Sequence, residues 1–172
     1  MFNTTDTTII CIDIQEKLVR IADENIKNNI IKLMKTASIL DIDTIITQQY
    51  PKGLGSTIDE IKQIKDFKTV EKTSFSVLKT PNFPEIKNKN VIVFGIETHI
   101  CVYQSACDLI KKGYNVIIVS DCCASRDEFN KSTALNNLAM QGANIMSLEM
   151  ILFEFLKSST HPHFKEIQAL IK

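Results

Sequence analysis

Short apolar segments rich in β-branched residues recur along the chain, separated by longer segments whose apolar residues stand three or four positions apart. The first pattern is typical of buried strands in a parallel sheet, and the second is typical of amphipathic helices. We expect strands within residues 7–14, 44–47, 68–71, 91–94, 115–119 and 144–147. We expect the main helices within residues 25–40, 98–113, 127–140, 149–157 and 162–172.

Strands and helices alternate along the whole chain, and this order indicates the fold class. It predicts a three-layer α/β/α sandwich with a mainly parallel, Rossmann-like sheet of six strands. The chain has 172 residues, a length that suits one domain, and it contains no internal repeat or linker-like segment. We therefore expect residues 1–172 to form a single domain.

Charge and cysteine content narrow the choice of partners and compartment. Lys and Arg number 20, as do Asp and Glu, so the charge balance gives no reason to expect nucleic acid or an anionic membrane as a partner. No apolar run approaches the roughly 20 residues of a membrane helix, and the N-terminus does not resemble a signal peptide. The five cysteines are an odd number and include no Cys-x-x-Cys pair, which argues against a disulfide framework and a structural zinc site and favours a reducing, cytoplasmic location.

Residues 91–102 are the most informative stretch for chemistry. Residues 91–94 are expected to form a buried strand, Gly95 to interrupt it, and Thr98 to cap a helix. Cys101 would then lie in the first helical turn, where free N–H groups and the helix dipole favour a thiolate. The alternative is that Cys101 is a small buried core residue, as most free cysteines are.

Three chemically active residues follow three different strands: Asp13, Lys72 and Cys101. The carboxyl ends of parallel strands meet at one edge of a sheet, so these side chains converge if their strands are neighbours. A carboxylate can take the thiol proton, and an ammonium favours both anions and lowers the pKa of the thiol. In the alternative interpretation Asp13 caps a loop, Lys72 is solvated and Cys101 is buried.

Five segments, in this order and covering nearly the whole chain, resemble motifs of the isochorismatase-like cysteine hydrolases, in particular the small single-domain members. These segments are residues 13–15, 49–57, 72–76, 95–102 and 121–126. The resemblance implies that Cys101 is the nucleophile, that Asp13 receives its proton and later activates water, and that Lys72 holds the two anions. It implies hydrolysis of a small amide or related C–N substrate through a thioester.

The resemblance also suggests how the rest of the site is built. It implies a cis peptide bond at Ile96–Glu97, with the N–H groups of Glu97 and Cys101 directed at the developing oxyanion. The residues expected to line the substrate pocket are Gln15, Gln49, Tyr50, Phe75, Glu97 and Ile100. Glu97 in such a pocket would favour a substrate that carries a hydrogen-bond donor or a positive charge.

Histidine placement separates this sequence from one branch of the family. The nicotinamidase branch carries an Asp-and-His metal site after its second strand, whereas residues 45–57 here contain no histidine. The three histidines are His99, His161 and His163. We therefore expect no metal and no other cofactor. The chain also has no room for the carrier domain found in siderophore-pathway isochorismatases.

Two other functions compete with hydrolysis. The chain could be an idle family member that serves as an oligomeric scaffold or small-ligand binding module. It could also be a thiol redox protein using Cys101, although no cysteine stands at the spacing of a resolving partner. Since the family commonly forms homo-oligomers, the resemblance implies at least a dimer, with a small molecule as the substrate.

Overall fold

A computed structural model describes residues 2–172, in which six strands form one sheet with the order β3-β2-β1-β4-β5-β6. Every neighbouring pair of strands is parallel. The predicted α/β fold with six strands is confirmed, and the sheet is parallel throughout. The strands are β1 (Thr7–Ile12), β2 (Asp43–Gln49), β3 (Lys68–Lys72), β4 (Asn90–Ile96), β5 (Asn115–Ala124) and β6 (Asn144–Met146).

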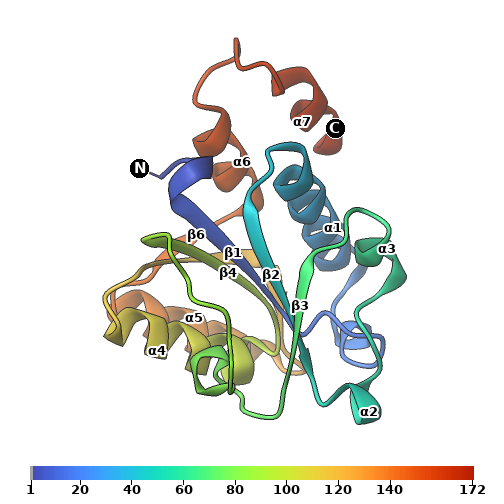
Figure 1. The fold of residues 1–172 in the computed structure, drawn as a ribbon, viewed down its shortest axis with the longest axis vertical. Helices are drawn as coiled ribbons and strands as arrows, with labels where there is room; N and C mark the ends of the chain where they lie inside the picture. Colours follow the sequence, from blue (N-terminus) through green and yellow to red (C-terminus); the bar gives the residue numbers. More distant parts are fainter. Residues whose placement is uncertain (1) are drawn as a thin grey trace.

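Helices cover both faces of the sheet (Figure 1), with α1 and α6 on one face and α4 and α5 on the other. The longer helices are α1 (Glu24–Ile39), α4 (Tyr103–Lys111), α5 (Glu128–Met140), α6 (Leu148–Leu156) and α7 (Phe164–Leu170). The shorter ones are α2 (Pro51–Leu54) and α3 (Asp59–Lys62), with 3₁₀ turns η1 (Thr4–Asp6), η2 (Val19–Ile21) and η3 (Val77–Lys79).

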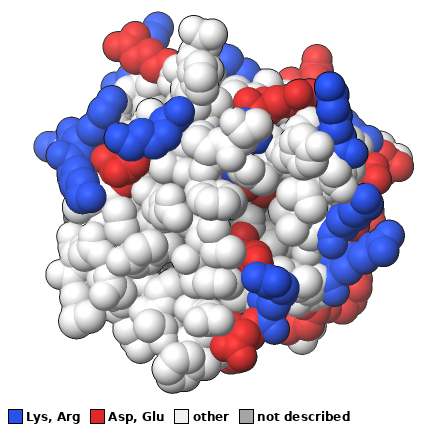
Figure 2. All heavy atoms as spheres, turned by 90° about the horizontal axis from the view of Figure 1, so that it is seen from below, with Lys and Arg blue, Asp and Glu red and all other residues white. Residues whose placement is uncertain are grey.

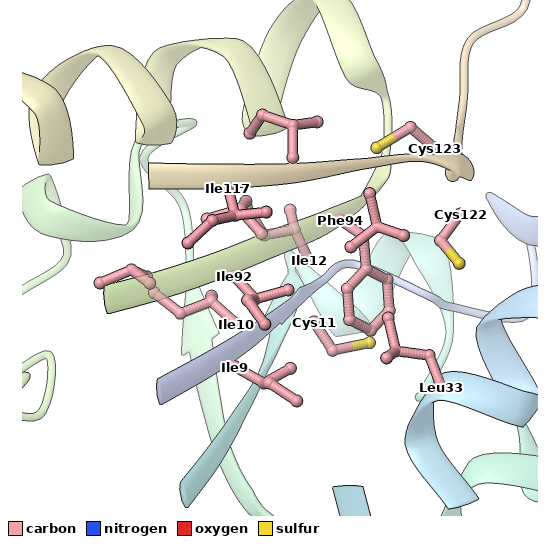
Figure 3. Close-up of a cluster of buried hydrophobic side chains, with 14 of the residues drawn as sticks. Ile9, Ile10, Cys11, Ile12, Leu33, Ile92, Phe94, Ile117, Cys122 and Cys123 are labelled. Carbon is pink, nitrogen blue, oxygen red and sulfur yellow. The ribbon is translucent and has the colours of Figure 1, made fainter. Parts of the chain in front are cut away.

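The core lies between the central strands and these helices. All six residues of β1 and all seven of β4 are buried, as continuous apolar strands covered on both faces should be. Helix α1 begins after Asp23, whose side chain accepts the Ile26 N–H, and it buries one apolar face. Figure 3 shows Leu33 of that face pointing toward Cys11 of β1 and Phe94 of β4.

Because all strands run the same way, their carboxyl ends lie together at one end of the molecule, the lower end in Figure 1 beside α2. Asp13 directly follows β1, Lys72 is the last residue of β3, and Glu97 directly follows β4. Figure 2 looks at this end and shows a broad area without Lys, Arg, Asp or Glu, bordered by charges of both signs.

The structure corrects three local expectations. The strand expected within residues 115–119 is longer, because β5 continues to Ala124 and pairs with the end of β4. Strand β4 in turn continues beyond Gly95 to Ile96, with a shift of register between Val93 and Gly95 that lets both strands extend. Thr98 does not cap a helix: residues Thr98–Val102 form a π-helical turn, η4, and the buried Thr98 hydroxyl has no hydrogen-bond partner within residues 2–172.

Gly95 is required where β4 passes close to the end of β1. Its φ is +140°, and a Cβ at this position would lie 2.0 Å from the carbonyl oxygen of Ile12. Ile12 precedes Asp13, so this close approach sets the position of the β1 end against the β4 end. Only glycine combines this φ with such a near backbone neighbour.

We predict that Gly95→Ala destabilises the protein by more than about 4 kcal/mol or prevents folding, because backbone atoms cannot move aside for the new methyl group. Gly142→Ala is the matched control, since Gly142 also has a positive φ of +98° but open space around its Cβ position. That control should cost only about 1–2 kcal/mol. Urea unfolding measures both, and equal losses would contradict the close-approach explanation.

Candidate active site

A buried ion pair joins the ends of β1 and β3. The Lys72 Nζ lies 2.7 Å from the Asp13 Oδ2, and neither side chain is exposed to solvent. Strand β2 lies between β1 and β3, so the long lysine side chain spans one strand to reach the carboxylate. Asp13 itself adopts a left-handed φ of +55°, which ends β1 and turns the chain away from the sheet.

Strand β2 supplies the groups that hold this pair. The Thr47 hydroxyl donates to Asp13 Oδ1 at 2.7 Å, and the Asp13 N–H donates to the Thr47 carbonyl at 3.2 Å. The Gln49 Oε1 accepts from Lys72 Nζ at 2.7 Å. Two longer contacts of 3.4 Å join Lys72 Nζ to the carbonyls of Ser74 and Phe75. Charged groups buried this deeply are stable only when they are paired and hydrogen-bonded, and both are.

The Gln15 side chain holds the backbone at the end of β2. Its amide donates to the carbonyls of Gln49 at 3.0 Å and Gly55 at 2.7 Å, and its Oε1 accepts the Gln49 N–H at 2.7 Å. The Gln49 Nε2 likewise donates to the Thr73 carbonyl at 2.9 Å. These bonds engage the polar groups of both glutamine side chains with protein atoms, so both side chains position the ion pair.

Cys101 lies in the π-helical turn η4 that follows β4, and it is 6% exposed. The pKa of its thiol is raised to about 12, chiefly by burial and then by the negative charge of Asp13, while Lys72 acts in the opposite direction. The expected lowering of the thiol pKa is therefore wrong. The sequence-based argument placed the sulfur at a solvated helix N-terminus, whereas it is buried beside a carboxylate.

The three residues predicted to converge thus do so, with a neutral thiol facing a buried carboxylate–ammonium pair.

Comparison with known proteins gives the family. The sequence profile of the Isochorismatase domain matches residues 7–150. The chain belongs to the isochorismatase-like hydrolase family.

Relatives support this membership over most of the chain. Isochorismatase domain-containing protein 1 from Danio rerio is 38% identical over 149 residues, a match that covers 82% of this chain and about half, 51%, of that protein. The structure described as MAR1 ribonuclease from Caenorhabditis elegans is 35% identical with a TM-score of 0.93, covering 99% of this chain and 91% of the other. The Escherichia coli YcaC gene product, described as an octameric hydrolase of unknown specificity, shares the fold at 21% identity with a TM-score of 0.88, covering 99% and 94%.

In this family member Glu97 already has a partner. Its Oε2 accepts from both the backbone N–H and the side-chain Nε of Arg126, each at 3.0 Å. The Arg126 side chain is 69% exposed, whereas that of Glu97 is 10% exposed. The Glu97 carboxylate therefore fixes the segment after β5, and a positively charged substrate would have to compete with Arg126 for it. The peptide bond between Ile96 and Glu97 is cis.

The aromatic residues expected in the pocket, Tyr50 and Phe75, are more exposed than Ile100. Tyr50, which has a left-handed φ of +38°, and Phe75 are about half exposed, and Ile100 is half-buried in η4. Tyr50 and Lys72 contribute to a cavity of about 430 Å³ that continues along Thr80 and Pro81. Cys101 and Phe75 are not among its lining residues.

The histidines lie apart from the ion pair. The His99 Nδ1 is 2.9 Å from the Ser125 hydroxyl, and its ring faces a separate cavity of about 260 Å³ beside α4 and α5. His163 contacts Glu166 near the C-terminus.

Residues 2–172 hold no group of three or more His, Cys, Asp or Glu side chains placed to bind a metal ion. In the same residues, no helix is long and apolar enough to cross a membrane.

Sequence reasoning missed Thr47 and did not foresee the contact between Arg126 and Glu97. Thr47 gave a weak signal, since it opens the run of polar residues that ends the otherwise apolar β2. Arg126 lies in one of the recognised motifs, but its contact depends on β5 extending beyond residue 120.

We predict that alkylation of Cys101 by iodoacetamide rises about tenfold per pH unit between pH 7 and 10 without a plateau, because the thiolate fraction grows below a pKa of about 12. Asp13→Asn should speed alkylation at a given pH, since it removes a negative charge that raises the thiol pKa. Lys72→Gln should slow it. Mass spectrometry of the labelled peptide measures each rate, with circular dichroism as the check on folding. A plateau near pH 8.5, or changes of the same sign in both variants, would contradict this account.

Proposed function

We propose that this chain is a cysteine hydrolase of a small amide or related C–N substrate, with Asp13, Lys72 and Cys101 as its catalytic residues. The observation that carries the proposal is the fully buried Lys72–Asp13 ion pair beside the thiol. A scaffold or simple binding module gains little from such a pair, because well-packed apolar residues are often as stable in its place. The same pair is useful wherever a proton must leave a thiol.

The reaction proceeds in two halves. The Cys101 sulfur attacks the substrate carbonyl carbon while its proton moves to the Asp13 carboxylate. The N–H groups of Glu97 and Cys101 donate to the oxyanion, and such donors are each worth about 3–4 kcal/mol of barrier. The C–N bond then breaks, and ammonia or an amine leaves with the proton from Asp13. In the second half Asp13 takes a proton from water, whose oxygen attacks the thioester. As the C–S bond breaks, Asp13 returns the proton to the departing sulfur, which releases the acid and restores the neutral Cys101 thiol.

A thiol that is neutral at rest suits this sequence of proton transfers. The proton that the leaving nitrogen needs is already on the sulfur, next to its acceptor. Lys72 stabilises the carboxylate before the transfer and the thiolate as it forms, because it acts on the thiol pKa in the direction opposite to Asp13. Cys101 is only 6% exposed, so little water reaches the sulfur at rest.

The substrate is expected to be small and not strongly charged. The strand-end face in Figure 2 has a broad uncharged area, and acidic and basic residues are equal in number along the chain. The worm relative is described as a ribonuclease. Surfaces that bind RNA carry clustered Lys and Arg, so the charge pattern here favours a small neutral molecule over a polynucleotide. The five free, buried cysteines fit the reducing cytoplasm.

We predict that an amide that is a substrate forms an acyl adduct on Cys101, detected by intact-protein mass spectrometry after a rapid acid quench. Cys101→Ala should abolish adduct and turnover, and Asp13→Asn should lower kcat by about 10²–10⁴-fold, since it removes the proton acceptor. Cys107→Ala is the control, because this neighbouring cysteine lies on α4 away from the ion pair. Turnover that survives in Cys101→Ala would reject the nucleophile.

The variant Asp13→Asn distinguishes the rate of hydrolysis from the reactivity of the Cys101 sulfur toward alkylation. This variant should alkylate faster than the wild-type protein while turning over more slowly, because alkylation depends on the thiolate and hydrolysis depends on the proton acceptor. Parallel loss of both activities would indicate damage to the fold.

We also propose that the chain self-associates, as the octameric YcaC protein does. Met150 and Phe153 of α6 are exposed, and the Phe153 ring packs near that of Phe164 at 6.5 Å between centroids. These side chains form an apolar surface at the C-terminal part of the chain.

We predict that multi-angle light scattering gives at least twice the mass of one chain. Phe153→Glu should reduce that mass, because a charge in an apolar interface is costly to bury. Phe129→Glu on α5, another exposed phenylalanine, is the control. A wild-type monomer would reject self-association, and a loss of mass only in Phe129→Glu would move the interface to α5.

A further inference from the structure

A buried serine connects the nucleophile's turn to the loop that surrounds the lysine. Ser105 lies on α4, four residues after Cys101, and it is fully buried. Its hydroxyl donates to the Cys101 carbonyl at 2.6 Å and accepts the Val77 N–H at 3.1 Å. A helical serine usually makes only the first of these bonds. The second reaches across to η3, a segment 28 residues earlier in the chain.

The segment that Ser105 reaches is the one that contacts the ammonium. The carbonyls of Ser74 and Phe75 lie 3.4 Å from Lys72 Nζ, immediately before Ser76 and Val77. A second bond supports the same connection, because the Ser76 hydroxyl donates to the Asp108 Oδ2 of α4 at 2.8 Å.

Hydrogen bonds within the loop of residues 73–80 also join its two ends, so a shift of one part would move the rest. The Ser74 hydroxyl donates to the Ser76 carbonyl at 3.0 Å and lies 2.9 Å from the Thr80 hydroxyl. Residues 73–80 therefore have few ways to move independently of α4, and α4 begins directly after η4, which carries Cys101.

We propose that Ser105, assisted by Asp108, is a positioning residue that fixes the Lys72 loop against the Cys101 turn and so sets how strongly the ammonium acts on the sulfur. This inference rests on the proposed function, since it concerns the same nucleophile and ammonium. Ser105 touches neither the reacting atoms nor Lys72 Nζ. Its effect passes through the Val77 N–H on one side and the Cys101 carbonyl on the other.

The test compares Cys101 alkylation rates at pH 9 in the wild-type protein, Ser105→Ala and Ser105→Thr. Ser105→Ala loosens the loop around Lys72, whose charge lowers the thiol pKa, so alkylation should slow by about threefold. Ser105→Thr keeps the hydroxyl and should restore most of the rate. Hydrogen exchange at the Val77 amide should accelerate in Ser105→Ala alone. Thr36→Val is the control, because buried Thr36 bonds to the carbonyl four residues earlier in α1 but to no loop.

A double-mutant cycle with Lys72→Gln distinguishes positioning from general loosening. If Ser105 acts through the ammonium, Ser105→Ala should change the rate little once the ammonium is gone. Should Ser105→Ala fail to fold, Asp108→Asn supplies a milder change, with slower alkylation expected in the same direction.

Two results would overturn the inference: an unchanged rate in folded Ser105→Ala, or an equal effect of Ser105→Ala with and without Lys72. Failure of the proposed function looks different, since no acyl adduct would then form on Cys101, or turnover would survive in Cys101→Ala, whatever the alkylation rates of the Ser105 variants.

Discussion

The ion pair between Lys72 and Asp13 is the interaction on which the strand-end region depends. Two opposite charges with no solvent exposure are stable only if every remaining polar atom around them is used. That requirement explains Thr47 and Gln49 on the intervening strand, and it explains why Gln15 holds the backbone of Gln49. Removing one charge would leave the other buried and uncompensated. The carboxyl ends of β1, β2 and β3 are therefore tied into one unit.

The position of the thiol next to this unit decides its resting state. A sulfur beside an ammonium alone would ionise readily, but here Asp13 offsets the ammonium and burial disfavours the charged form. The Cys101 thiol is consequently neutral at rest and lies next to the Asp13 carboxylate. In the proposed reaction ionisation is coupled to attack on a substrate, and the raised pKa makes the Cys101 thiol slow to react with oxidants and alkylating agents.

Sequence reasoning could predict the convergence of Asp13, Lys72 and Cys101 from the alternation of strands and helices, on the condition that the three strands lie close together in the sheet. Parallel strands place all their carboxyl ends on one edge, whatever the side-chain details. It could not predict the sign of the thiol pKa shift or the partner of Glu97. Both depend on how far β5 extends and on how deeply η4 is buried, and these are properties of packing. The change from apolar to polar residues at the end of β2 pointed to Thr47, but a search for typical catalytic residue types overlooks a threonine.

Backbone conformation adds a further link between fold and site. Asp13 and Tyr50 follow β1 and β2 with left-handed φ values, and Gly95 lies at a positive φ near the end of β4. A non-glycine residue in that region costs on the order of 1–3 kcal/mol and persists only where its surroundings enforce it. At Asp13 the surroundings are the Thr47 bonds, the Lys72 ammonium and the close passage of Gly95 beside Ile12. If the backbone of Asp13 were extended instead of left-handed, the chain would continue β1 and the carboxylate would point away from Lys72. The left-handed turn is therefore the local feature that converts the end of a core strand into one half of the ion pair.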